Sequence, residues 1–288
     1  MIERAVRITE VGPRDGLQNE HRAVPTARKV AFVDALSLAG FPEIEVSSFV
    51  NPARVPQLAD ASEVFARIAR RPGTVYSALV PNERGLDAAL AAKVDKVAVF
   101  TAASEGFSRA NTGASIADVI ERLAPVVRRA CALPMPVRGY VSCIVRCPYD
   151  GPVQPVHVRD ACERLLDLGV TEVDLGETLG VAQPDDIRRV LGALGERLAP
   201  STITLHLHDT NGQGVANAMA ALEMGVRSFD SSAGGLGGCP FAPGARGNVA
   251  TDALVRAVED AGYSTGVDRA ALARATASIV QDLADAST

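Results

Sequence analysis

Short apolar segments alternate with longer amphipathic segments along most of the chain. The short segments have the length and composition of buried β-strands, whereas the longer ones repeat apolar residues with the period of an α-helix. We predict eight strands, at residues 6–11, 43–49, 75–80, 96–101, 137–143, 172–175, 203–208 and 227–231. Helices are predicted at residues 26–39, 59–70, 82–92, 115–130, 156–168, 184–198, 215–224, 249–261 and 268–283.

Regular alternation of strands and helices is typical of a parallel β-sheet. Eight strand–helix units in 288 residues favour the α/β class and a single (β/α)₈ TIM barrel, with the last helix as an extra C-terminal element. The alternative is an open, doubly wound sheet, which fits fewer strands. No linker rich in Pro or Ser divides the sequence, so we expect residues 1–288 to form one catalytic domain.

Individual residues mark the ends of several predicted elements. We expect Thr26 to cap the N-terminus of the first helix and Gly40 to follow its C-terminus. Asn82 is expected to cap the third helix. Residues 102–114 are predicted to form a polar loop and residues 234–247 a Gly-rich loop.

The overall composition is that of an ordinary globular protein, with 47% hydrophobic and 22% charged residues. The net charge of −5 does not favour nucleic-acid binding, and no apolar run is long enough to predict a membrane span. The N-terminus lacks the pattern of a secretory or transit peptide, and the five cysteines lack zinc-type spacing. We therefore expect a cytoplasmic protein with reduced thiols.

Two of the four histidines, His206 and His208, lie two residues apart in the sequence Leu-His-Leu-His. In a strand this spacing puts both imidazoles on one face. A single buried histidine is more often structural, but two on one strand face favour a metal site. Asp209 then either orients an imidazole or caps the following turn.

Two other strand ends also carry charged residues, and in (β/α)₈ barrels functional groups collect at the C-terminal ends of the strands. Arg14 and Asp15 follow the first predicted strand. Taken alone, they favour a local ion pair in a turn. Glu45 lies among apolar residues of the second strand, and a buried carboxylate is costly when it is unpaired. It therefore either faces a hydrated interior or pairs with a cation such as Arg14.

The predicted loop after the last strand has four glycines within residues 234–238. Such a segment is expected to be mobile and is typical of a lid. Cys239 follows it, and an exposed loop thiol is more often functional than a buried one. Asn248 either caps the next helix or offers its carbonyl oxygen to a metal.

A metal site can be assembled from these strand ends. Two nitrogen and two oxygen ligands leave two positions of an octahedron free for substrate or water. This mixed set favours Mg²⁺ or Mn²⁺, with Zn²⁺ or Co²⁺ as alternatives. The four candidate ligands are Asp15, His206, His208 and Asn248.

The motifs of this chain resemble those of the 3-hydroxy-3-methylglutaryl-CoA lyase family. The resemblance covers nearly the whole chain and is carried by residues 11–20, 45–50, 140–143, 147–149, 206–210, 234–240 and 247–248. A wider superfamily of metal-dependent lyases and synthases shares the Arg-Asp and His-x-His elements, whereas Gly-Gly-Leu-Gly-Gly-Cys-Pro is characteristic of the lyases. The resemblance implies cleavage of an acyl-CoA to acetyl-CoA and acetoacetate. It also implies a homodimer or a larger homo-oligomer.

The resemblance implies roles for individual residues as well. Arg14 would stabilise an enolate oxygen, Glu45 would lie near the reacting centre, and Cys239 would move a proton from a closing loop. His206 is our first candidate for a proton relay, with a neighbouring carboxylate or a metal-bound water as the alternatives. The implied metal ligands are again Asp15, His206, His208 and Asn248. The expected substrate contacts are Arg14, Gln18, Ser142 and Thr178.

Three positions depart from the family pattern: Glu177 replaces Asp, Asn211 replaces an aromatic residue, and Arg146 replaces a small residue. A lyase for a related branched 3-hydroxyacyl-CoA therefore stays as an alternative. A Claisen-type synthase, a metal-dependent hydrolase and a barrel that binds metal or CoA without turnover are less favoured. Residues 108–111 either contact the CoA nucleotide or form a solvated loop.

Overall fold

Eight parallel strands close into a barrel in the order β1-β10-β9-β8-β5-β4-β3-β2. The computed structural model describes residues 5–20, 22–195, 198–239 and 242–285, with the backbone alone for 238, 239, 242–246 and 285. The barrel strands are β1 (Arg7–Glu10), β2 (Glu43–Ser48), β3 (Val75–Leu79), β4 (Lys96–Ala102), β5 (Val137–Ser142), β8 (Glu172–Glu177), β9 (Ile203–Leu207) and β10 (Ser228–Ser231). The predicted (β/α)₈ barrel is confirmed.

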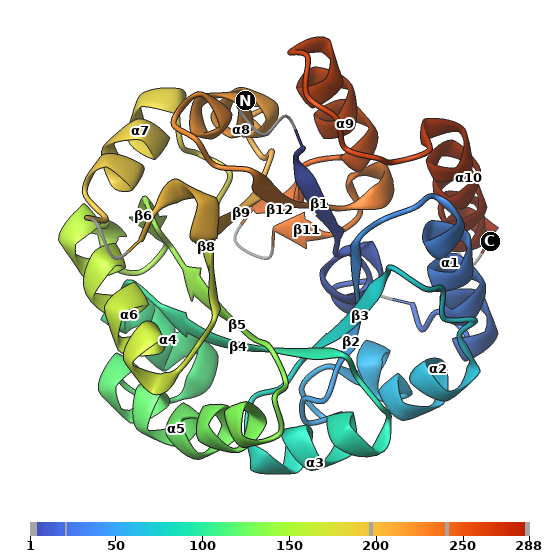
Figure 1. Ribbon diagram of the computed structural model, residues 1–288, viewed down its shortest axis with the longest axis horizontal. Coiled ribbons are helices and arrows are strands. Elements are labelled where there is room, and N and C mark those ends of the chain that lie inside the picture. The colour runs from blue at the N-terminus through green and yellow to red at the C-terminus, as the bar shows by residue number, and fades with distance from the viewer. Residues whose placement is uncertain (1–4, 21, 196–197, 240–241, 286–288) are drawn as a thin grey trace.

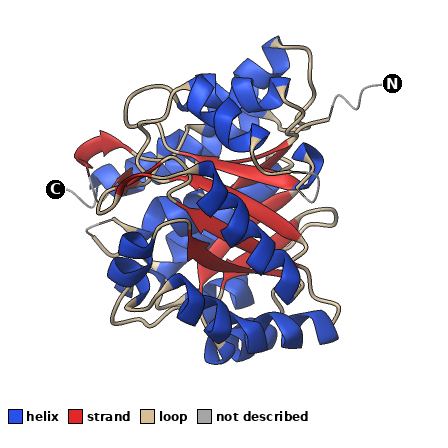
Figure 2. Cartoon of the chain, turned by 90° about the vertical axis from the view of Figure 1, so that its left-hand side faces the viewer, coloured by secondary structure: helices blue, strands red, loops and turns tan. Residues whose placement is uncertain are grey.

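Helices surround the strands on all sides, as the views along and across the barrel show (Figure 1 and Figure 2). They are α1 (Thr26–Leu38), α2 (Ala61–Arg67), α3 (Glu83–Ala91), α4 (Glu105–Thr112), α5 (Ile116–Ala132), α6 (Pro155–Leu168), α7 (Pro184–Gly192), α8 (Gly214–Glu223), α9 (Thr251–Asp260) and α10 (Arg269–Asp285). The predicted extra helix, α10, packs against α1. Among the described helices, none has the length and hydropathy needed to cross a membrane.

The prediction of a continuous polar loop at residues 102–114 was wrong, because this segment contains α4. Ser104 caps the helix, since its Oγ accepts a hydrogen bond from Phe107 N at 3.2 Å. The helix ends at Gly113, which has a φ of +71° that favours glycine. The predicted Asn82 cap is confirmed, because its Oδ1 accepts from Gly85 N at 2.9 Å.

Three other local predictions also need correction. Thr26 begins α1 but does not cap it, because its Oγ1 donates to Asp60 Oδ2 at 2.7 Å. Helix α7 ends at Gly192 rather than at residue 198. The predicted Gly-rich loop contains an antiparallel pair of strands, β11 (Gly238–Cys239) and β12 (Ala242–Arg246).

A second short antiparallel pair of strands is formed by β6 (Arg146–Cys147) and β7 (Gly151–Pro152).

The barrel interior contains a buried network of charged side chains centred on Arg138 of β5, which is 1% exposed. Its Nη2 lies 2.8 Å from Glu172 Oε1 and 3.2 Å from Glu43 Oε2, and both carboxylates belong to the first residues of their strands. Its Nη1 lies 3.0 Å from Asp230 Oδ1 on β10. The guanidinium therefore connects the lower part of the barrel to the strand ends that carry the candidate site.

We expect Arg138→Met to lower the free energy of unfolding by about 3–5 kcal/mol, because it leaves buried carboxylates without their partner. Urea denaturation of the purified protein measures this loss. Arg129→Met is the matched control, since Arg129 forms an exposed ion pair with Asp87 and should cost at most about 1 kcal/mol. Equal losses in the two variants would contradict the structural role of Arg138.

Candidate active site

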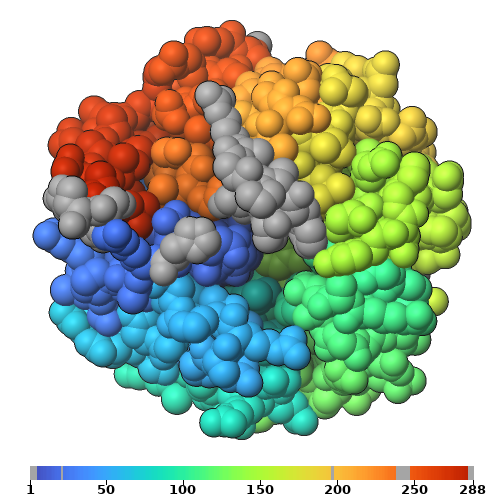
Figure 3. Space-filling model, turned by 180° about the vertical axis from the view of Figure 1, so that it is seen from behind, coloured from blue at the N-terminus to red at the C-terminus, as the bar shows by residue number. Residues whose placement is uncertain are grey.

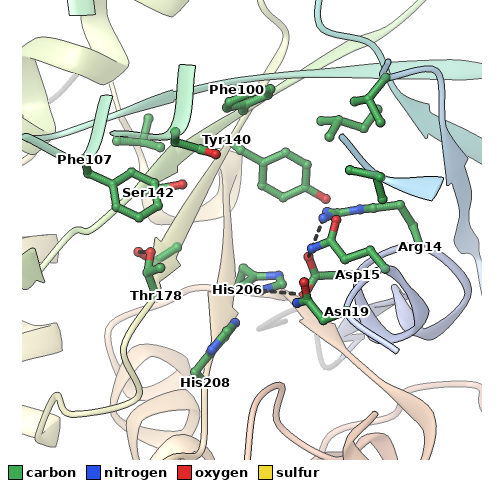
Figure 4. A pocket seen from close by; sticks show the side chains of 17 residues that line it. Arg14, Asp15, Asn19, Phe100, Phe107, Tyr140, Ser142, Thr178, His206 and His208 are labelled. Atoms are coloured by element: carbon green, nitrogen blue, oxygen red, sulfur yellow. Dashed lines mark hydrogen bonds and ion pairs between the residues drawn. The ribbon is translucent and has the colours of Figure 1, made fainter. Parts of the chain in front are cut away.

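A cavity of about 350 Å³ opens at the C-terminal ends of the barrel strands. We call it the catalytic pocket. It appears as a hollow between segments from the first half of the chain in the space-filling view (Figure 3). Figure 4 shows its polar side chains converging from the loop after β1 and from β9, with aromatic rings on the opposite side.

Arg14 and Asp15 lie in a single π-helical turn, η1 (Gly12–Gly16), directly after β1. Arg14 is 6% exposed and lies between two carboxylates: its Nε donates to Glu45 Oε2 at 2.6 Å, and its Nη1 donates to Asp15 Oδ1. Burial lowers the pKa of Arg14, but Glu45 and Asp15 outweigh this effect and hold it above its ordinary value. Of the two interpretations of Glu45, the pairing with Arg14 is therefore confirmed.

Glu10, the last residue of β1, fixes this turn. Its Oε1 accepts hydrogen bonds from Gly12 N at 2.8 Å and Ala233 N at 2.9 Å, and its Oε2 accepts one from Thr251 at 2.7 Å. Burial raises the pKa of Glu10 to about 7, although these hydrogen bonds lower it. One carboxyl group thus ties η1 to the segment after β10 and to α9.

His206 and His208 point into the pocket from the C-terminal end of β9, as the alternation of the strand predicts. The intervening Leu207 and the preceding Leu205 are buried in the hydrophobic core. The imidazole centroids lie 5.3 Å apart. One ligand atom from each histidine and one from Asp15 all lie within 4.8 Å of one another.

The chemistry of Asp15 and His208 fits a divalent cation. Burial and then the neighbouring His206 lower the pKa of His208 to about 4, so this imidazole is neutral and keeps a lone pair. Burial raises the pKa of Asp15, but Arg14 and both histidines outweigh it and lower the pKa to about 2. Among the described residues, none forms a hydrogen bond with the buried Nδ1 of His208. A neutral imidazole, an ionised carboxylate and a buried nitrogen without a partner are what a metal site requires.

Asp230 orients His206, a role that the sequence analysis missed. His206 Nδ1 lies 3.2 Å from Asp230 Oδ2, and Asp230 Oδ1 lies 3.0 Å from Arg138. This contact leaves His206 Nε2 facing Asp15 Oδ2 at 3.8 Å. Burial lowers the pKa of His206, but the hydrogen bond that its imidazole donates to Asp230 and the charge of Asp15 outweigh it and raise the pKa. The signal in the sequence was a carboxylate inside a predicted barrel strand, as for Glu45.

Asn248 lies beside the cluster, because it forms a β-bridge with His208. Its Nδ2 donates to Asp15 Oδ2 at 2.8 Å and to Leu236 O at 3.1 Å. Ligation through Oδ1 requires the amide to turn over, so a metal-ligand role for Asn248 stays a prediction. Gly237, with a φ of +104°, is needed here because a Cβ would lie 2.8 Å from Asn248 Nδ2.

The other predicted substrate contacts also reach the catalytic pocket. Gln18, Ser142 and Thr178 line it, and Gln18 Nε2 donates to Asp15 Oδ1 at 2.7 Å. Thr178 Oγ1 accepts a hydrogen bond from Cys143 N at 2.9 Å. Cys239 belongs to β11, and its side chain lies outside the described part of the structure.

The three residues that depart from the family pattern are not among the described residues that line the catalytic pocket. Arg146 and Asn211 are exposed, whereas Glu177 is buried at the end of β8. Burial raises the pKa of Glu177 to about 7, against hydrogen bonds from nearby backbone N–H groups. Their positions therefore do not support the expectation that these three residues change the acyl specificity by direct contact with the substrate.

Residues 108–111 form part of α4 rather than a solvated loop. Ser108 is buried, and its Oγ donates to Ala114 O at 2.9 Å. Asn111 lines the catalytic pocket. Arg109 is exposed and pairs with Glu105 on the same helix.

A buried carboxylate and two imidazoles at the mouth of a (β/α)₈ barrel form a candidate metal site at the place where TIM-barrel enzymes carry their active sites. A family model described as HMGL-like matches residues 5–279, and the chain belongs to this family of lyases. The chain is 48% identical over 271 residues to the 3-hydroxy-3-isohexenylglutaryl-CoA/hydroxy-methylglutaryl-CoA lyase of Pseudomonas aeruginosa. That alignment covers 94% of this chain and 90% of the relative.

Solved structures of related proteins agree with this assignment. The HMG-CoA lyase of Brucella melitensis superposes with a TM-score of 0.95 at 49% identity, covering 96% of this chain and 98% of that chain. An HMG-CoA lyase of Acinetobacter baumannii, solved in complex with coenzyme A and 3-methylmalate, superposes with a TM-score of 0.92 at 36% identity. It covers 97% of this chain and 92% of that one.

We expect Asp230→Asn to weaken Mn²⁺ binding about 10- to 100-fold, because His206 loses the carboxylate that orients it. Titration of free Mn²⁺ by electron paramagnetic resonance measures this directly. Asp174→Asn is the matched control: Asp174 also contacts Arg138, at 3.3 Å, but burial raises its pKa and favours a neutral group. If both variants bind Mn²⁺ as tightly as the parent protein, Asp230 does not act through His206.

Proposed function

We propose that this chain is a divalent-metal-dependent lyase that cleaves 3-hydroxy-3-methylglutaryl-CoA to acetyl-CoA and acetoacetate. The observation that carries this proposal is the buried cluster of Asp15, His206 and His208 beside the guanidinium of Arg14. The cluster provides a place for a cation, and Arg14 provides a second positive charge next to it. The related HMG-CoA lyases support the choice of substrate.

The reaction breaks the bond between C2 and C3 of the acyl group. The 3-hydroxyl loses its proton, its oxygen becomes the keto oxygen of acetoacetate, and the electron pair of the broken bond passes to the acetyl-CoA enolate. Protonation of the enolate carbon completes acetyl-CoA. The site must therefore remove one proton, stabilise negative charge on the thioester oxygen and return one proton.

Arg14 is suited to stabilise the enolate oxygen. Glu45 and Asp15 fix the guanidinium of Arg14. The Tyr140 ring also packs against this guanidinium, with Arg14 Cζ 5.3 Å from the ring centroid. A guanidinium has five N–H donors, so these two contacts leave others for a substrate oxygen. A donor held in place before the reaction costs little reorganisation when charge develops.

Asp15, His206 and His208 would hold the metal, and Asn248 would complete the set. When bound, Mg²⁺ or Mn²⁺ supplies a Lewis acid for the substrate oxygens, and Zn²⁺ or Co²⁺ are alternatives. Gln18, Ser142 and Thr178 are proposed to position the acyl group. These assignments rest on the chemistry of the side chains and on their place in the catalytic pocket.

Two residues are candidates for the proton transfers. His206 is the candidate relay, and its Nδ1 faces the buried carboxylate of Asp230. Cys239 is the candidate donor to the enolate carbon, on the basis of the resemblance. A homodimer or a larger homo-oligomer is also proposed on that basis. A cytoplasmic location is proposed from the cysteines, whose odd number and scattered positions favour reduced thiols.

A lyase for a larger branched acyl group is the second candidate. The Pseudomonas aeruginosa relative carries both a methyl and an isohexenyl substrate in its name. A synthase, a hydrolase and a binding protein without turnover are less consistent with membership of a lyase family.

We expect purified protein with Mg²⁺ or Mn²⁺ to release acetoacetate from 3-hydroxy-3-methylglutaryl-CoA. Chelation should abolish release and added metal should restore it, because the three-residue cluster requires a cation. Coupled detection of acetoacetate measures the rate. Free thiol without acetoacetate would indicate a hydrolase, and binding of acyl-CoA without either product would indicate a protein without turnover.

We expect Arg14→Gln to lower kcat about 10²- to 10³-fold, since it removes a fixed donor to the enolate oxygen. Mn²⁺ and CoA binding should persist. Steady-state kinetics and Mn²⁺ titration distinguish these effects, with the exposed Arg188→Gln as the control. An increase in KM at unchanged kcat would show that Arg14 only binds the substrate.

A further inference from the structure

Tyr140 lies in the middle of the inward face of β5. Arg138, Tyr140 and Ser142 alternate along this strand, so their side chains share the face that points into the barrel. Arg138 belongs to the charged network of the lower barrel, and Ser142 lines the catalytic pocket. Tyr140 also lines the catalytic pocket and is 8% exposed. Its side chain therefore lies between the charged network and the reacting centre.

The ring of Tyr140 packs against the guanidinium of Arg14, whose Cζ lies 5.3 Å from the ring centroid. A cation over an aromatic face is attracted by the ring, and the attraction is stronger when both groups are removed from water. Both side chains meet this condition, because Arg14 and Tyr140 are buried. An arginine side chain has many rotamers, so a ring against its guanidinium limits the positions that this group can take.

The hydroxyl of Tyr140 holds the carboxylate that anchors the same guanidinium. It donates to Glu45 Oε2 at 3.1 Å, and Arg14 Nε donates to the same oxygen at 2.6 Å. Figure 4 shows the hydroxyl directed towards Arg14. Among the described residues, none forms a hydrogen bond with the other oxygen of this carboxylate, the buried Glu45 Oε1. The direction of the carboxylate therefore depends on the contacts of Oε2 with Arg14 and Tyr140.

Asp230 offers the hydroxyl a second acceptor. Asp230 Oδ2 lies 3.3 Å from the oxygen of Tyr140 and 3.2 Å from His206 Nδ1. A phenol has one O–H to donate, so at any moment it serves either Glu45 or Asp230. The shorter hydrogen bond is the one to Glu45, and the ring packs against the arginine that Glu45 anchors. These two contacts favour a role through Arg14 over a role through His206.

We propose that Tyr140 is a positioning residue that holds the guanidinium of Arg14 in place for the reaction, through its ring and through Glu45. The inference rests on the lyase activity proposed above and assigns one more residue to it. The N–H donors of Arg14 that Glu45 and Asp15 do not use must point at the enolate oxygen before charge develops there. Tyr140 therefore acts on the rate of the chemical step rather than on substrate binding.

Two substitutions separate the hydroxyl from the ring. Tyr140→Phe keeps the ring and should lower kcat for acetoacetate release about tenfold, because the charged carboxylate of Glu45 loses a hydrogen bond. KM should stay within about threefold of the parent value, since the interaction is used in the transition state. Mn²⁺ binding should persist, because no candidate metal ligand is changed. Tyr140→Leu removes the ring as well and should lower kcat about 100-fold.

Tyr76→Phe is the matched control. Tyr76 lies on β3, is 1% exposed and also has an arginine over its ring, with Arg70 Cζ 5.6 Å from the centroid. Its hydroxyl donates to Ser37 Oγ at 2.9 Å, and it is not among the described residues that line the catalytic pocket. This variant should keep the parent kcat. Equal decreases in kcat for Tyr76→Phe and Tyr140→Phe, or no decrease for Tyr140→Phe, would overturn the inference.

The decisive readout is the effect of Tyr140→Phe in the Arg14→Gln background, where the guanidinium is absent. A residue that acts through Arg14 should then change kcat by less than about twofold, because both substitutions disrupt the same arrangement. A larger further loss would show that Tyr140 acts independently of Arg14, through Asp230 or on the substrate itself. That result overturns the inference and leaves the proposed lyase activity intact.

The parent protein, assayed with Mg²⁺ or Mn²⁺, separates this inference from the proposed function. If it releases no acetoacetate, the proposed function is removed and, with it, the inference. If it is active, the comparison of Tyr140→Phe in the two backgrounds decides the question, even where Tyr140→Leu does not fold.

Discussion

The candidate site depends on the closure of the barrel between β1 and β10. Parallel pairing of Arg7–Glu10 with Ser228–Ser231 brings the start of the chain beside its last barrel strand. Asp15 follows β1 directly, and His206 lies on β9, the next strand beyond β10. Without this pairing, a carboxylate and two imidazoles almost 200 residues apart in sequence would not share one cation.

The second constraint on the structure is that the buried charges in and beneath the site must be paired. Arg14 is held by Asp15 and Glu45, and Arg138 is held by Glu43, Glu172 and Asp230. Each guanidinium is buried, so each requires its carboxylates, and the carboxylates in turn require the guanidinium. Because Asp230 contacts both Arg138 and His206, the orientation of a candidate metal ligand depends on a network that reaches the lower barrel. We infer that stability and metal binding are coupled in this protein.

Much of the fold could be predicted from the sequence because a buried parallel strand and an amphipathic helix have different hydrophobic periods. The position of Arg14, Asp15 and the two histidines at the C-terminal ends of predicted strands then indicated that they would lie near one another. Periodicity could not show α4, whose eight residues depend on a Ser104 cap rather than on an apolar stripe. Nor could it show that Thr26 would bond to Asp60, because that contact joins residues 34 positions apart.

The contribution of Asp230 was inaccessible to the sequence for a related reason. A carboxylate inside a barrel strand indicates a buried partner but not which one, since the partner comes from another strand. Glu177, Asn211 and Arg146 depart from the family's sequence pattern, yet they are not among the described residues that line the catalytic pocket.

We propose that Asp15, His206 and His208 hold one divalent cation at the reacting centre. Anomalous X-ray diffraction from a crystal grown with Mn²⁺ tests it most directly, because the signal locates the metal independently of any activity. We expect a single strong peak in contact with Asp15 and both imidazoles, next to the guanidinium of Arg14. A peak elsewhere, or no peak at this cluster at saturating Mn²⁺, would contradict it.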